Sequence, residues 1–274
     1  MSAVGLFPSF PISTCVEYDC FFLLCVRPER PTEVTKTAPH FLFIKYPVGV
    51  IGKKTTLTME NRVINFRPFV GKNYATTGFQ GKRILILGES HYCKAELAEG
   101  GRCFPLCKAD QMVEDCFSQT EDVLNDFIYN YYGDASQRTF LCFERAFLGK
   151  ELTQEERENF WESIMFYNYL QFSQPGPRCP IAEEYWGQSE QAFRQLLETY
   201  LPDYIISWGV RLFDGMPGWG GEASKLIVDG DSTDIWTYTI NGKSIPMLKV
   251  HHPSSPTGKC WEYWHKFYKA FLQQ

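Results

Sequence analysis

Short apolar runs alternate with amphipathic stretches along the chain beyond residue 82. The first run, residues 83–87, reads Arg-Ile-Leu-Ile-Leu and stops at Gly88, as is typical of a buried parallel strand. Three further apolar runs, at residues 163–169, 204–208 and 246–251, lead into polar or Gly/Pro-containing segments. Together they predict a central sheet of four mostly parallel strands.

The stretches between these runs carry the period of helices that bury one face. Ser118 with Glu121, and Thr153 with Glu156, have the spacing of a capping box and mark two helix starts. Ser189 is expected to cap a third helix, and a fourth helix closes the chain. The residues expected on the four apolar faces are Leu124, Phe127, Ile128 and Tyr131; Phe160; Ala192, Leu196, Leu197 and Tyr200; and Trp261, Trp264, Tyr268 and Phe271.

Alternating strands and helices predict an α/β fold of three layers, α/β/α, with right-handed crossovers that place helices on both faces of the sheet. Ligands of such folds bind beyond the carboxyl ends of the parallel strands. The segments that follow the four strands are therefore where we expect a functional site.

Residues 1–58 differ from the rest of the chain. Their apolar bursts are short, are broken by prolines and show no sustained period. These prolines are Pro28, Pro31, Pro39 and Pro47. We interpret the segment as an irregular N-terminal extension, and Met59 as the natural start of a domain covering residues 59–274. The alternative is a small appendage that packs on this domain.

Composition limits the range of partners. Of the 274 residues, 44% are hydrophobic and 22% charged, and the formal charge is −5. These values are typical of a globular protein and argue against nucleic-acid binding through a broad basic surface. They still allow a local site that binds one or a few nucleotides. The ten cysteines are scattered through ordinary helical and strand sequence and are expected to be reduced thiols. With no apolar run of membrane-spanning length and no signal peptide, we expect a cytoplasmic monomer without a membrane partner.

Polar residues concentrate at the ends of the four predicted strands. The first strand runs into Glu89-Ser90-His91-Tyr92, and the second ends near Asn168. The third ends at Trp208-Gly209, and the fourth at His251-His252-Pro253-Ser254-Ser255. Each segment alone is weak evidence, but their shared location predicts one polar pocket of nucleobase size.

The order and spacing of these segments resemble the uracil-DNA glycosylase superfamily over roughly residues 81–272. Members of that family carry Gly-Gln-Asp-Pro-Tyr-His after the first strand, a Gly-Leu-Cys-Phe segment, an asparagine ending the second strand, a Trp-Gly pair and a His-Pro-Ser motif. The corresponding stretches here are Gly88-Glu89-Ser90-His91-Tyr92-Cys93, Gly101-Arg102-Cys103-Phe104, Asn168, Trp208-Gly209 and His252-Pro253-Ser254. Five short motifs in the correct order are much more specific than any one of them.

The resemblance implies a DNA glycosylase that extrudes a uracil-type or otherwise altered base and hydrolyses its N-glycosidic bond, as in base-excision DNA repair. Phe104 would stack on the base, Asn168 would pair with its imide edge, and Tyr92 would exclude a methyl group at C5. His252 would stabilise the negative charge on the departing base. The turn Ser254-Ser255 would hold a phosphate of DNA or of a nucleotide.

Two departures from the family pattern bear on catalysis. The family's water-positioning aspartate is replaced by Ser90, which cannot serve unaided as a comparable general base. Glu89 is the nearest alternative carboxylate, and His91 is a second candidate. The apolar wedge that follows the family's His-Pro-Ser motif is replaced by Pro256 and Thr257, which favours single-stranded DNA or a free nucleotide as the substrate.

Each candidate also has a purely structural interpretation. Ser90 could cap the helix after the first strand, and Asn168 could be a turn residue. Phe104 and Trp208 could be core aromatics. Of the adjacent pair His251-His252, strand alternation allows only one residue to face the pocket.

No metal and no cofactor is expected. Four cysteines lie near His91 in the sequence, but their spacing fits no standard zinc or iron–sulfur pattern. They are Cys93, Cys103, Cys107 and Cys116. The glycine-rich run at residues 215–221 lacks the Gly-Lys-Ser/Thr of a phosphate-binding loop and is expected to be a plain loop.

Two other functions stay open at this level. The pocket could belong to a non-catalytic nucleotide-binding or nucleic-acid-binding module, in keeping with the replacement of aspartate by Ser90. Less favoured is a hydrolase with Ser90 as the nucleophile and His252 as the base. The sequence alone therefore does not decide whether the protein is an enzyme.

Overall fold

The computed structural model describes residues 64–92, 114–131, 133, 137–174, 180–181, 183–255 and 261–274. All of them belong to one compact unit. Several predictions fall outside the described residues and stay predictions. They concern residues 1–58, Met59, Phe104, Pro256, Thr257 and the cysteines Cys93, Cys103 and Cys107.

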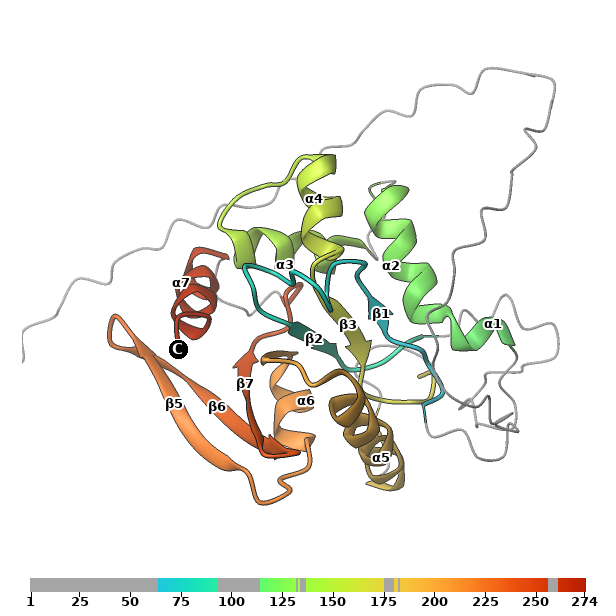
Figure 1. Ribbon diagram of the computed structural model, residues 1–274, viewed down its shortest axis with the longest axis vertical. Coiled ribbons are helices and arrows are strands. Elements are labelled where there is room, and N and C mark those ends of the chain that lie inside the picture. The colour runs from blue at the N-terminus through green and yellow to red at the C-terminus, as the bar shows by residue number, and fades with distance from the viewer. Residues whose placement is uncertain are drawn as a thin grey trace, which may run out of the picture. The chain divides into compact units, whose positions relative to one another are not determined.

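A seven-stranded sheet lies at the centre of the described part (Figure 1). Its strands are β1 (Phe69–Val70), β2 (Ile84–Gly88), β3 (Met165–Asn168), β4 (Tyr204–Trp208), β5 (Glu222–Val228), β6 (Asp231–Ile240) and β7 (Lys243–Val250). They take the order β1-β3-β2-β4-β7-β6-β5. Neighbours within the block β3-β2-β4-β7 are parallel, whereas β1 joins one side and β6 and β5 the other in antiparallel pairing. The α/β class and the four predicted strands are confirmed, but these strands form only part of a larger mixed sheet.

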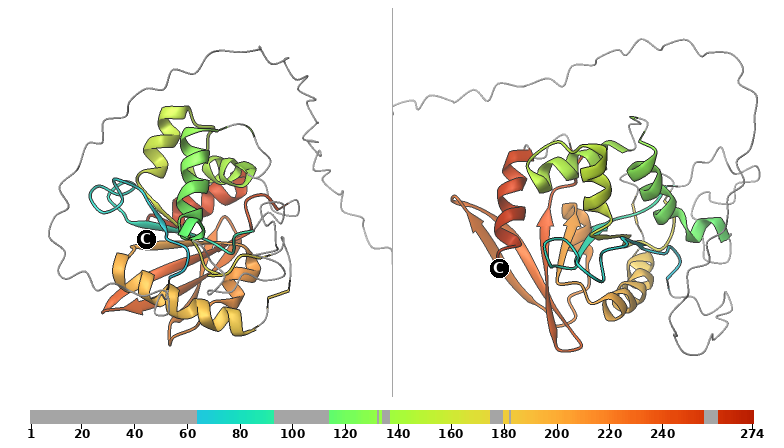
Figure 2. Two further views of the ribbon diagram at one scale, coloured as in Figure 1. Left: turned by 90° about the vertical axis from the view of Figure 1, so that its right-hand side faces the viewer. Right: turned by 45° about the horizontal axis from the view of Figure 1, so that its top comes forward.

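Helices cover both faces of the sheet, as the left view in Figure 2 shows. The helices are α1 (Glu114–Phe117), α2 (Gln119–Tyr129), α3 (Arg138–Leu148), α4 (Gln154–Trp161), α5 (Glu183–Tyr200), α6 (Val210–Gly215) and α7 (Trp261–Phe271). Alternate strand residues point to opposite faces, so Ile84 and Ile86 pack with α2, α3, α4 and α7. Leu85 and Leu87 pack with α5 and α6 on the other side. We call these the α2/α3 face and the α5/α6 face.

Strands β5 and β6, which the apolar pattern did not predict, form an antiparallel hairpin. A second tight turn joins this hairpin to β7 of the parallel block. Asp229-Gly230 joins β5 to β6, and Asn241-Gly242 joins β6 to β7. The φ angles are 52° and 84° in the first turn and 51° and 78° in the second, as type I′ turns require. Asp-Gly and Asn-Gly are the strongest short signals for a hairpin, so the turns pointed to β5 and β6 more clearly than their half-exposed strands did. Of the run predicted as a loop at residues 215–221, residues 216–221 connect α6 to β5, whereas Gly215 is the last residue of α6.

The two predicted capping boxes had different outcomes. At the start of α4, Thr153 and Glu156 form the box, because each side chain bonds to the backbone N–H of the other residue. At α2 the Ser118 hydroxyl donates to Asp122 instead, and makes no cap hydrogen bond. The carboxylate that the box requires, on Glu121, pairs with Arg67 at 3.0 Å, so a tertiary ion pair takes the place of the local motif.

The predicted start of α5 was wrong. The helix begins at Glu183, so Ser189 lies inside it, where its buried hydroxyl accepts a hydrogen bond from the backbone N–H of Gln171.

In α2 the predicted face is buried up to Ile128, but Tyr131 lies beyond the end of the helix and is exposed. Among the described residues, no helix has the length and apolar character needed to cross a bilayer.

Candidate functional site

The register of the parallel block brings the predicted site segments to one edge of the sheet. Gly88 ends β2 opposite Asn168, which ends β3. Trp208 ends β4 opposite Val250, which ends β7 two residues before His252. From β3 to β7 there are three strand spacings, about 14 Å in total, so side chains from both ends can reach a planar ligand between them.

Asn168 lies against the end of the neighbouring strand. A Cβ atom added at Gly88 would stand 2.3 Å from Oδ1 of Asn168 and 2.9 Å from Cζ of Phe166. Both distances are far below van der Waals contact, so only glycine leaves room for the Asn168 carboxamide. The glycine that ends the predicted strand thus has a second role, which is to seat the asparagine.

Gly88→Ala is expected to destabilise the protein by about 1–3 kcal/mol, because the new methyl group must displace Asn168 or Phe166. Gly187→Ala is the matched control: Gly187 lies within α5, and nothing stands within 4 Å of a Cβ there. That variant should be stabilised by roughly 0.5–1 kcal/mol, since alanine loses less backbone entropy in a helix. Urea unfolding measures both, and equal effects of the two substitutions would contradict the close contact at Gly88.

His91 is buried beneath Asn168. Its Nε2 lies 2.8 Å from Oγ1 of Thr120 and 3.1 Å from Nδ2 of Asn168, and its Nδ1 lies 3.4 Å from the same Nδ2. The ring meets Phe66 edge to face at 4.7 Å. Burial lowers the pKa of His91 to about 3, so the imidazole is neutral at physiological pH.

This burial predicts a loss of stability in acid. The ordinary histidine pKa is 6.5, whereas the folded pKa is about 3, so between these pH values the unfolded chain binds a proton that the folded protein does not. The free energy of unfolding should therefore fall as the pH drops from 6.5 toward 3, by up to about 1.4 kcal/mol per pH unit from this group. His91→Gln, which cannot titrate, should show a shallower decline between pH 6 and pH 4 in urea unfolding. Identical slopes for the two proteins would contradict the buried neutral imidazole.

Gln171 holds the segment that follows β3 in place, a role that sequence analysis missed. Its Oε1 accepts hydrogen bonds from the backbone N–H groups of Asn65 and Phe66 at 2.8 and 2.9 Å. Its Nε2 donates to the backbone oxygen of Asn168 at 2.9 Å. The first two partners precede it by 106 and 105 positions, so no local pattern could have revealed this role.

His252 begins a tight turn that orients its ring. The backbone N–H of Ser255 donates to the oxygen of His252 at 2.9 Å. Nδ1 of His252 lies 3.0 Å from the hydroxyl of Ser254, which also receives a hydrogen bond from Thr139 at the start of α3. The neighbouring His251 packs its ring on Trp264 of α7 at 5.2 Å, in keeping with a structural role for one of the two histidines.

Trp208 connects the two halves of the candidate site. It is 3% exposed, and its ring centroid lies 5.2 Å from that of Phe166 on β3 and 6.5 Å from that of His252. The alternative interpretation of Trp208 as a core aromatic therefore fits the structure. Its indole N–H is buried and has no hydrogen-bond partner within the described part of the chain, which is an unusual cost for a buried donor.

The residues after β2 do not all join this group. The carboxylate of Glu89 forms a two-pronged ion pair with Arg211 of α6, with one contact of 2.8 Å, and α6 packs on the α5/α6 face. The hydroxyl of Ser90 is buried and has no hydrogen-bond partner among the described residues, so it makes no bond to His252. Tyr92 is 46% exposed, and its backbone pairs with Gln174. The structure thus groups Asn168 at the end of β3 with His91 from the segment after β2, and places His252 beyond Trp208. Glu89 is directed away from this group.

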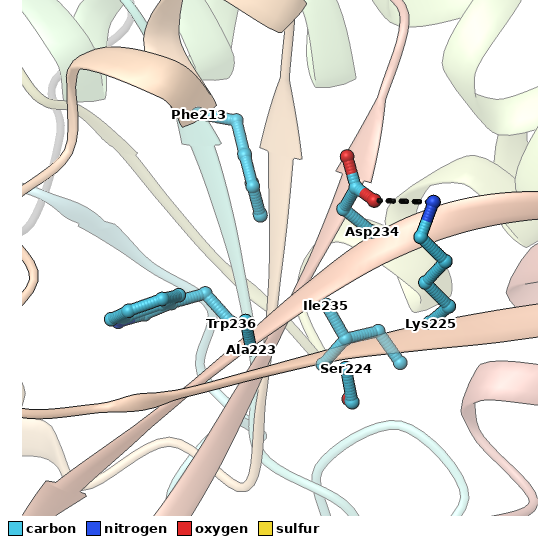
Figure 3. Close-up of a pocket in the computed structure, with 7 residues that line it drawn as sticks. All are labelled: Phe213, Ala223, Ser224, Lys225, Asp234, Ile235 and Trp236. Carbon is cyan, nitrogen blue, oxygen red and sulfur yellow. Dashed lines mark ion pairs between the residues drawn. The ribbon is translucent and has the colours of Figure 1, made fainter.

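Two surface hollows lie away from this edge. One, of about 350 Å³, lies beside α6 and the β5–β6 hairpin, where Phe213, Trp236 and the ion pair of Lys225 and Asp234 border it (Figure 3). The other, of about 370 Å³, lies between the segment around Phe79 and the helices α3 and α4. Neither hollow includes a residue from the predicted site.

Within the described ranges, no three His, Cys, Asp or Glu side chains are grouped as metal ligands would be.

No family model matches the chain, and no curated protein does.

Proposed function

We propose that the edge formed by Asn168, Trp208 and His252 binds one nucleobase and that the protein is a DNA glycosylase of the uracil-DNA glycosylase type. The observation that carries this proposal is the seating of the Asn168 carboxamide over Gly88, at the same sheet edge as His252. An amide offers a donor and an acceptor to a base edge, and an imidazole can donate to a charged base. The ordered motifs of the sequence support the same assignment.

In this reaction the bond from C1′ of the sugar to the base nitrogen breaks, and its electron pair leaves with the base. His252, with its ring held by Ser254 through Nδ1, donates a hydrogen bond to the base oxygen on which the negative charge develops. Water adds its oxygen to C1′ and gives up a proton to solvent. Ser90, which stands where the family has its aspartate, cannot take the proton as a carboxylate would.

The missing carboxylate sets the expected rate. Because Glu89 is paired with Arg211 and His91 is buried and neutral, neither is placed to act as the general base. General base catalysis typically contributes 10²–10⁴-fold, so the protein should be slower by about that factor than an enzyme that has the aspartate. Its rate would depend mainly on stabilisation of the leaving base.

The same observations favour a second candidate, a nucleotide-binding module without turnover. Within the part of the chain that the structure describes, the group around Asn168 holds no carboxylate free to activate water. A nucleophilic Ser90 would need a hydrogen bond to its base, and it makes none to the described residues, so no observation favours the serine hydrolase.

Release of free base from labelled oligonucleotides separates the two candidates. The panel should contain uracil, hypoxanthine and oxidised pyrimidines, each in single-stranded and double-stranded DNA. We expect release of uracil or another altered base, faster from single strands. Tight retention of the same oligonucleotides without release would favour the binding module, and neither release nor retention by folded protein would contradict both.

A further inference from the structure

Strand β5 is the last strand at one end of the sheet, and its outer side is open. It pairs with β6 and with no other strand among the described residues. Most of its seven residues are exposed, and Ile227 is 69% exposed. The outer side of such a strand presents unpaired backbone N–H and C=O groups, with which another extended chain can pair.

The turn between β5 and β6 determines which backbone groups of β5 point outward. Because this turn has two residues, the flanking residues Val228 and Asp231 form the hydrogen-bonded pair that closes the hairpin. In antiparallel pairing, residues that bond to the partner strand alternate with residues that do not. The N–H and C=O groups of Ala223, Lys225 and Ile227 therefore point away from β6, toward the open side.

The side chains of the same three residues lie on the α5/α6 face. Leu226, which lies between two of them, packs into the core of the opposite face. Ala223 and Lys225 border the hollow of about 350 Å³, which Phe213 and Trp236 also line (Figure 3). A strand added to β5 would therefore place every second side chain on the same face as this hollow.

The three outward positions favour three different kinds of partner side chain. Ala223 is small and lies opposite Trp236 on β6, so the hollow has room for a large apolar side chain next to it. Lys225 is exposed and lies 3.7 Å from Asp234, and an acidic side chain directly across from it would be favourable. The exposed Ile227 would be covered by an apolar side chain.

We propose that the outer side of β5 binds an extended peptide of a partner protein that carries an apolar, an acidic and an apolar residue at alternate positions. A second copy of this chain fits less well. The antiparallel register that pairs all seven residues sets Lys225 opposite Lys225, and like charges directly opposite are destabilising. This surface shares no residue with the nucleobase site, so either proposal can fail without the other.

NMR of the full chain labelled with ¹⁵N tests the binding. The probe is the synthetic peptide acetyl-Thr-Leu-Thr-Glu-Thr-Leu-Thr-amide, whose pattern reads the same in both directions, and the control peptide has lysine in place of glutamate. At millimolar concentration the acidic peptide should shift the amide signals of β5 and slow hydrogen exchange at Ala223, Lys225 and Ile227. The lysine peptide should bind about fivefold more weakly. Absence of these shifts, or equal binding of the two peptides, overturns the inference.

The variants Ile227→Pro and Ile227→Val test the backbone pairing. Proline removes an outward N–H without breaking a hydrogen bond to β6, whereas valine keeps this N–H and the branched side chain. Ile227→Val should bind the acidic peptide within about twofold of the wild type, and Ile227→Pro about tenfold more weakly. Equal binding by the two variants overturns the inference.

Lys225→Glu tests the charge without changing the backbone, and it decides the question if proline disturbs the fold. Because Lys225 is exposed, the variant should fold, and it should prefer the lysine peptide to the acidic one. An unchanged preference for the acidic peptide overturns the inference. Self-association of the wild-type chain that the peptide displaces, measured by sedimentation, would show that a second copy occupies β5 and would overturn it as well.

Discussion

His252→Ala is expected to lower the single-turnover rate of base release by about 10²–10³-fold, the usual cost of removing one donor to a developing oxyanion. The ring of His252 is exposed, is oriented by Ser254 and lies edge to face with Trp208. Its removal leaves the departing base without that hydrogen bond. Because the side chain contributes little to the core, stability should change by less than about 0.5 kcal/mol.

His251→Ala is the matched control for this prediction. His251 is the adjacent histidine, but its ring packs on Trp264 of α7. We expect this variant to lose some stability and to keep base release within about threefold of the wild type, since the ring has no part in the proposed chemistry. If the two alanine variants release base equally fast, His252 does not stabilise the leaving group.

Glu144→Ala is expected to cost about 3–5 kcal/mol of folding free energy, the largest effect on stability that we predict. Glu144 of α3 is buried and accepts two-pronged hydrogen bonds from Arg157 of α4, at 2.9 Å to Oε2 and 3.2 Å to Oε1. It also accepts from Nε1 of Trp161 at 2.9 Å. Burial raises the pKa of Glu144, although the hydrogen bonds from Arg157 and Trp161 oppose the rise. Alanine would leave a buried guanidinium without a counter-charge and an indole N–H without an acceptor.

Two comparisons test this explanation by urea unfolding. Glu198→Ala breaks the exposed pair of Arg194 and Glu198 and should cost less than about 0.5 kcal/mol. The double variant Glu144→Leu/Arg157→Met should be more stable than Glu144→Ala, because no unpaired charge is left. If Glu144→Ala proves as mild as Glu198→Ala, the buried pair does not hold α3 to α4. The position of α3 bears on the site, since Thr139 at its start bonds to Ser254.

The central strands could be predicted because each is a short apolar run buried on both faces. Residues 204–208 were predicted as a strand with the bounds that β4 has, and β2 and β3 differ by one or two residues at their ends. Strands β5 and β6 were not predicted, because much of each strand faces solvent and polar residues interrupt the apolar run. Their Asp-Gly and Asn-Gly turns carried the missing information.

The sequence could predict which strand ends form the candidate site, but not the hydrogen-bond and ion-pair partners of its side chains. That Asn168 and His252 share one edge follows from the parallel order of the strands. Whether a carboxylate is free depends on contacts between distant segments, and the pairing of Glu89 with Arg211, 122 positions away, has no local signal. The burial of His91 by Thr120 and Phe66 is of the same kind. These contacts change the chemistry of Glu89 and His91, which sequence analysis had predicted as candidate catalytic residues.

A crystal structure of the protein with a single-stranded oligonucleotide carrying 2′-fluoro-deoxyuridine would show directly where a base binds. We expect the uracil ring beyond the carboxyl ends of β2 and β4, with its N–H within hydrogen-bond distance of Oδ1 of Asn168 and one carbonyl oxygen facing His252. A base seated elsewhere, for example between Phe213 and Trp236 in the hollow of Figure 3, would mean that this sheet edge is not the functional site.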